Sequence, residues 1–133
     1  MSPALDAGAA QAHNGARACS LESPMSESSP EVRVVLCTCP AEHAERIART
    51  VLEERLVACV NVVSGVKSLY WWKGEIQDDP ETLLVIKTPS AQYARLEQRL
   101  LEIHPYQVPE VLSLDVVDGS RSYISWVREA ATC

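Results

Sequence analysis

Two cysteines separated by one residue, Cys37 and Cys39, are the first side chains along the chain with the chemistry of a metal site. They end the apolar run VRVVLCTC, whose length and composition predict a short strand over residues 32–39, bounded by Pro40. Alternate side chains of a strand point to the same face, so the two sulfurs would lie on one face, about 7 Å apart along the chain. Thiolates are soft ligands that suit Cu(I) and Zn.

The competing interpretation of this cysteine pair is structural. Free cysteine is among the most buried residue types and then acts as a small apolar side chain. Metal and redox motifs use C-x-x-C more often than C-x-C, so the spacing taken alone favours core residues. The sequence leaves both interpretations open.

A histidine and a group of acidic residues are the other candidates. His104 lies in EIHPYQVPE at the end of a predicted helix, where an imidazole can cap the helix, pack, or bind a metal ion. Carboxylates are hard oxygen ligands that suit Ca and Mg. Four of them lie close together but lack the regular spacing of a calcium loop, so we expect a solvated rim of a hairpin. These are Glu75, Asp78, Asp79 and Glu81.

Five further elements must position these side chains. The helix AEHAERIARTVLEERL carries apolar residues at the spacing of one face. Residues 57–88 are predicted to be extended, with a kink at Ser64–Gly65, a hairpin turn at Lys73–Gly74, and a bulge or bend at DDP (78–80). The others are a helix that begins at Pro89–Ser90 and ends before Pro105, with the apolar stripe Tyr93, Leu96, Leu100 and Ile103, a strand over 110–118, and a C-terminal helix with Tyr123, Ile124, Trp126 and Val127.

The order β-α-β-β-α-β plus a terminal helix predicts an α+β fold, the ferredoxin-like split βαβ unit with a long central hairpin. In such a fold the helices cover one face of the sheet. The other face would still carry apolar residues of the first strand, and Tyr70, Trp71 and Trp72 would place large rings on both faces of the hairpin. Exposed apolar area of this size favours oligomerisation; cover by the C-terminal helix is the alternative.

The bulk composition narrows the class of protein. The chain has 133 residues, 47% hydrophobic and 23% charged, which predicts one domain. We expect a disordered N-terminal tail over 1–31 and a folded domain over 32–131. A net charge of −6 disfavours nucleic acid and anionic membranes, and no run approaches the roughly 20 apolar residues of a membrane span. Five cysteines without a secretory segment favour a reducing cytoplasm.

Three segments together resemble the CutA family, known as divalent-cation tolerance proteins. They are LVACVNVVSGVKSLYWWKGEIQDDPETLLVIKT, HPYQVPEVLSLDV and YISWV, and the resemblance runs from about Val34 to Val127. It implies a homotrimer of ferredoxin-like subunits whose hairpins pair between neighbours, with Tyr70, Trp71 and Trp72 at the interface. It also implies binding of Cu or other divalent ions, with no obligatory cofactor.

The family's copper site matches the thiol of Cys37 and two adjacent histidines before PYQ. Only the second histidine is present here, as His104, because Ile103 replaces the first. The metal-site prediction is therefore Cys37, His104 and, as a substitute ligand, Cys39.

The resemblance carries no catalytic reaction. An acyl-phosphate hydrolase on this fold would need a Gly-rich anion loop and an Arg after the first strand, whereas CTCPAEH has neither. We therefore expect a non-catalytic protein of copper and divalent-cation tolerance. The alternative is a stable trimeric scaffold or a small-ligand sensor similar to PII signalling proteins, with Lys67, Tyr70 and Lys87 lining a cleft between subunits.

Overall fold

The structure of the chain, a computed structural model, describes residues 30–132. The elements are β1 (Val32–Cys39), α1 (Ala41–Glu53), β2 (Cys59–Trp72), β3 (Glu75–Pro89), the 3-10 turn η1 (Ser90–Gln92), α2 (Tyr93–Ile103), β4 (Leu112–Asp115) and α3 (Arg121–Ala130). The predicted β-α-β-β-α-β order with a terminal helix is confirmed. The tail predicted over 1–31 falls, except for its last two residues, outside the described part of the chain.

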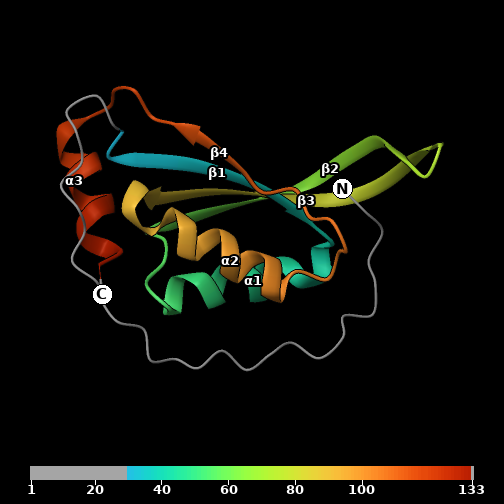
Figure 1. Ribbon diagram of the computed structural model, residues 1–133, viewed down its shortest axis with the longest axis horizontal. Helices are drawn as coiled ribbons and strands as arrows, with labels where there is room; N and C mark the ends of the chain where they lie inside the picture. Colours follow the sequence, from blue (N-terminus) through green and yellow to red (C-terminus); the bar gives the residue numbers. More distant parts are fainter. Residues whose placement is uncertain (1–29, 133) are drawn as a thin grey trace.

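The four strands form one antiparallel sheet in the order β2-β3-β1-β4. Helices α1 and α2 lie side by side on one face, and α3 stands at one end of the sheet (Figure 1). This is the predicted ferredoxin-like arrangement. None of the helices described in residues 30–132 is long and apolar enough to cross a bilayer.

The core lies between the sheet and the two helices. Leu96 and Leu100 of α2 are fully buried, as the apolar stripe predicted, and Ile47 of α1 packs with them. Val35, Cys37 and Cys39 project from β1 into the same cluster, because odd-numbered residues of this strand face the helices. The central strand thus delivers both thiols to the core.

The long hairpin turns where the sequence predicted. Lys73 and Gly74 have φ values of 53° and 82°, the left-handed pair of a two-residue hairpin turn that glycine favours. The pairing of β2 with β3 shifts between Val63 and Val66, and Gly65 there has φ 81°. The predicted kink at Ser64–Gly65 is therefore a β-bulge.

The interruption predicted at Asp78–Pro80 is wrong. Strand β3 runs unbroken through Pro80, which pairs with Lys67. The pairing of β1 with β3 ends at Cys39 and Thr82, so β3 has no strand on its other side at Pro80. A proline is tolerated at such an edge because no ladder bond needs its missing N–H.

The fourth strand is shorter than the predicted 110–118. It spans only Leu112–Asp115, because its partner β1 begins at Val32 and the last pair joins Arg33 to Asp115. Beyond that point the chain turns toward α3.

The face of the sheet opposite α1 and α2 is apolar and largely open. We call it the open face; Val34, Leu36, Leu83, Val85, Leu112 and Leu114 lie on it. Helix α3 packs at one end, where its Val127 is fully buried. Leu112 and Leu114 nevertheless stay 55% and 50% exposed, so the C-terminal helix covers the open face only in part.

Candidate functional site

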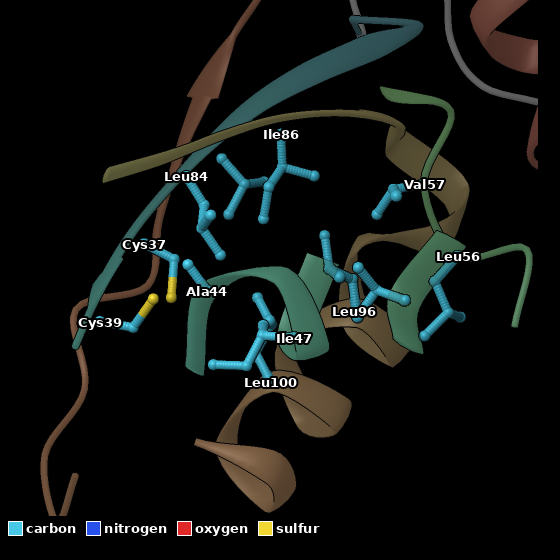
Figure 2. Close-up of a cluster of buried hydrophobic side chains, with 12 residues drawn as sticks. Cys37, Cys39, Ala44, Ile47, Leu56, Val57, Leu84, Ile86, Leu96 and Leu100 are labelled. Carbon is cyan, nitrogen blue, oxygen red and sulfur yellow. The ribbon is translucent and has the colours of Figure 1, made fainter. Parts of the chain in front are cut away.

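The two thiols of β1 lie together at the core side of the sheet. Cys37 and Cys39 are both 0% exposed. Figure 2 shows their sulfurs close to each other and beside Ala44 of α1. The prediction that they share a face is confirmed, and so is the interpretation that both are core residues.

Burial controls the protonation of these thiols. Desolvation, followed by the charge of the neighbouring Cys39, raises the pKa of Cys37 far above its ordinary value. Desolvation, then the negative charge of Glu81, raises the pKa of Cys39 to about 11, and the guanidinium of Arg46 opposes this rise. Both thiols are therefore protonated at neutral pH, and a metal ion must displace those protons to bind.

His104 is tied to the segment between the two cysteines. It follows the last residue of α2 and is 4% exposed. Its Nε2–H donates to the carbonyl of Thr38 at 2.7 Å, while Nδ1 accepts the backbone N–H of Tyr106 at 3.1 Å. The second bond requires the proton to be on Nε2. Desolvation is the main cause of the lowered pKa of His104.

This geometry answers a point that the sequence left open. Cys37, Cys39 and His104, from two elements separated by more than 60 residues, do meet around Thr38. Both ring nitrogens of His104 are however occupied by hydrogen bonds. Within residues 30–132, no three or more His, Cys, Asp or Glu side chains are arranged so that they could hold a metal ion together. A three-ligand site is therefore not preformed, and the metal-site residues stay a prediction.

A buried carboxylate, Glu81, lies beside this group and was not expected there. It is 3% exposed, its Oε2 accepts a hydrogen bond from the hydroxyl of Tyr106 at 2.5 Å, and its Oε1 is buried without a partner. The Tyr106 ring packs against His104 with centroids 4.8 Å apart. The prediction of a solvated rim is wrong for Glu81, because the loop after α2 folds over it. The PYQ segment next to His104 was the sequence signal for Tyr106.

The remaining acidic residues of the hairpin do not converge. Asp79 accepts a hydrogen bond from Tyr70 at 2.5 Å, and the pKa of Tyr70 rises to about 12, chiefly through desolvation and then through this bond. Asp78 pairs instead with Lys67 at 3.4 Å. Since Asp78 and Asp79 are neighbours in a strand, they point to opposite faces of the hairpin.

The residues considered for a small-ligand cleft are also dispersed in one chain. Lys67 and Tyr70 lie three positions apart in β2, hence on opposite faces. Lys87 hydrogen-bonds Asn61 across the β2–β3 pair. Any cleft that uses all three must draw on more than one chain.

The tip of the hairpin extends beyond the helix layer (Figure 1). On its helix side it carries Leu69, Trp71 and Ile76, which are 64%, 70% and 64% exposed. We call these three residues the hairpin patch. Tyr70 and Trp72 point to the other side and are half-buried.

Comparison with known proteins gives a consistent answer. The family model described as "CutA1 divalent ion tolerance protein" matches residues 33–130. The "Divalent-cation tolerance protein CutA" of Thermus thermophilus is 46% identical over 97 residues, which are 72% of this chain and 94% of that protein. Human "Protein CutA" is 42% identical over 113 residues, 80% of this chain and 63% of that protein.

Solved structures agree, and plant relatives leave the cellular location open. The Thermus thermophilus protein has a TM-score of 0.73 at 45% identity, covering 77% of this chain and 99% of its own. The "PII-like protein CutA" of Nostoc has a TM-score of 0.72 at 40% identity, covering 74% and 96%. Relatives from rice and Arabidopsis are named chloroplastic, so the cytoplasmic location stays a prediction. With a family match across nearly all of the folded residues, this chain belongs to the CutA1 divalent ion tolerance family.

Proposed function

We propose that this chain is a non-catalytic, homotrimeric protein of divalent-cation tolerance that binds copper or another divalent metal ion as cargo. The observation that carries the metal part is the bond from His104 to Thr38, which places an imidazole next to the thiols of Cys37 and Cys39. Sulfur and imidazole donors suit copper and zinc, whereas the hairpin carboxylates point in different directions.

The assembly part rests on uncovered apolar surface. The open face and the hairpin patch lie on different sides of the sheet, and each exposes several large apolar side chains. Contiguous apolar patches of this kind mark protein–protein contacts in soluble proteins. Two unlike surfaces that meet head to tail produce a closed ring, which is compatible with a trimer.

The absence of catalysis is supported by the arrangement of the acid–base groups. His104 uses both ring nitrogens within the fold, and Glu81 is enclosed beneath Tyr106. The connection after β1 is the single residue Pro40, which has no N–H to offer an anion.

Sedimentation velocity and anaerobic equilibrium dialysis test the proposal on the reduced protein. We expect three times the chain mass at micromolar concentration, and near one copper or zinc ion per chain. Cys37→Ser should lose the ion but remain trimeric. A monomer would refute the assembly, and binding unaffected by the substitution would refute the metal site.

A second candidate function is a PII-like small-ligand sensor or a stable scaffold without a physiological metal. It is favoured by the absence of a preformed three-ligand group in residues 30–132 and by the similarity to the Nostoc protein named PII-like. A trimer that binds neither copper nor zinc in the dialysis experiment would select this alternative.

A further inference from the structure

We infer that the site takes monovalent copper, held by the sulfurs of Cys37 and Cys39 alone, and that His104 is a structural link and not a ligand. This inference rests on the proposed metal binding and specifies its ion and its ligands. It differs from a site that combines one thiol with histidine, because it uses both cysteines of the C-x-C segment.

The number of available ligands is the first argument. Among residues 30–132, no third His, Cys, Asp or Glu completes a set with the two thiols. The remaining described cysteine, Cys59, begins β2 and pairs with Lys87 on the open face, whereas Cys37 and Cys39 face the helices. The described part of the fold thus offers a pair of sulfurs and nothing more.

The ion is chosen by that pair. Zinc in structural sites is almost always four-coordinate, and Cu(II) prefers tetragonal nitrogen and oxygen donors. Calcium and magnesium need six or more oxygen ligands. Monovalent copper is soft and forms a stable complex with two thiolates, so it is the ion that this pair satisfies.

The hydrogen bonds show which donors are available. The contact of the Cys37 sulfur with the carbonyl of Thr38 is long, at 3.9 Å, and thiols are weak donors. The facing residue of α1 is Ala44, the smallest side chain in the core cluster. Little therefore opposes a small shift of the sulfurs around an ion.

His104 is in the opposite situation. Turning its ring toward an ion would leave the Thr38 carbonyl and the Tyr106 N–H without their present partners. A buried polar group left unpaired costs about 1–3 kcal/mol. The imidazole therefore stabilises the fold by joining β1 to the segment after α2, and stays out of the coordination sphere.

The binding step balances simply. Two thiols each release a proton, two copper–sulfur bonds form, and the oxidation state of copper does not change. The complex carries one net negative charge beside Glu81, which opposes it, and Arg46, which favours it. No oxidant or reductant is consumed when the ion is supplied as Cu(I).

The test uses the full-length reduced protein, Cu(I) supplied anaerobically, and bicinchoninate as a coloured competitor. X-ray absorption of the loaded parent protein identifies the coordinating atoms. The matched control is the triple variant Cys19→Ala, Cys59→Ala, Cys133→Ala, which retains only the two thiols of β1. His104→Gln keeps an N–H that can donate to Thr38 but removes the imidazole.

We expect only sulfur next to copper, and one Cu(I) per chain in both the parent and the triple variant. Cys39→Ala should weaken binding more than about 100-fold, beyond the range of changes outside the coordination sphere, whereas His104→Gln should stay near the parent. Imidazole nitrogen bound to copper would overturn the inference, as would Cu(I) binding that survives Cys39→Ala. The absorption spectrum of the parent decides even if a cysteine variant misfolds.

The two proposals fail in distinguishable ways. Loss of the sulfur pair with zinc or Cu(II) still bound would sink this inference and leave the proposed function intact. No binding of any of the three ions would refute both.

Discussion

Replacement of Trp71 in the hairpin patch tests the assembly most directly. Trp71 is 70% exposed in a single chain, because the helix layer ends before the hairpin tip. A tryptophan side chain buries at most about 250 Å², so about 175 Å² remains for contact with another chain. At about 25 cal/mol per Å², that area is worth about 4 kcal/mol for each contact. Within a single chain, Trp71→Ala can remove only the smaller buried part, about 2 kcal/mol at most by the same coefficient.

Sedimentation equilibrium over a concentration series measures the predicted effect. A loss of about 4 kcal/mol per contact weakens association by roughly a thousandfold, so Trp71→Ala should dissociate where the parent protein stays assembled. Leu101→Ala is the matched control, since Leu101 is 51% exposed on the outer side of α2 and should not affect assembly. The reasoning is refuted if Trp71→Ala associates as tightly as the parent, or if Leu101→Ala weakens assembly equally.

Three further predictions concern stability. Tyr106→Phe removes the hydroxyl that bonds Glu81, leaving a buried carboxylate without a donor, and should cost about 3 kcal/mol in urea unfolding, whereas an unchanged midpoint would contradict the role of this bond. The pKa of His104 lies below its ordinary 6.5, so the unfolded chain takes up the proton first and stability should fall as pH drops below about 6.5; metal-free His104→Gln should lose less stability between pH 7.5 and 5.5, and equal losses would exclude His104 as the cause. Gly74→Ala should cost about 1 kcal/mol through its φ of 82° alone, because a Cβ there would contact nothing; calorimetry would show a lower melting temperature for this variant than for the parent.

The fold was predictable because its local rules agree with one another. Apolar spacing marked both helices, and Leu96 and Leu100 are buried as their stripe required. Lys73–Gly74 formed the expected turn because the left-handed conformation there depends on residues adjacent in sequence. Pro80 misled the prediction because its tolerance depends on whether a neighbouring strand is present, which is not a local property.

The candidate site was predictable in its members but not in their state. Cys37, Cys39 and His104 were identified from residue type and resemblance, and they do meet around Thr38. Their hydrogen bonds and burial depend on Tyr106 and on the loop after α2, which are distant from β1 in sequence. Glu81 shows the same limit, since a carboxylate in a charged hairpin is expected in solvent until a second segment is seen to cover it.

The sequence by itself determined the order of elements, the turn of the hairpin, the pairing of two thiols on one strand face, and the family. These properties follow from backbone geometry over a few residues and from motifs that can be compared directly. Only the tertiary structure decided that the thiols are buried and protonated, that both nitrogens of His104 are engaged, and that Glu81 is enclosed. Solvation and hydrogen bonding are set by whichever segments pack nearby, and here those segments lie more than 20 residues apart in the chain.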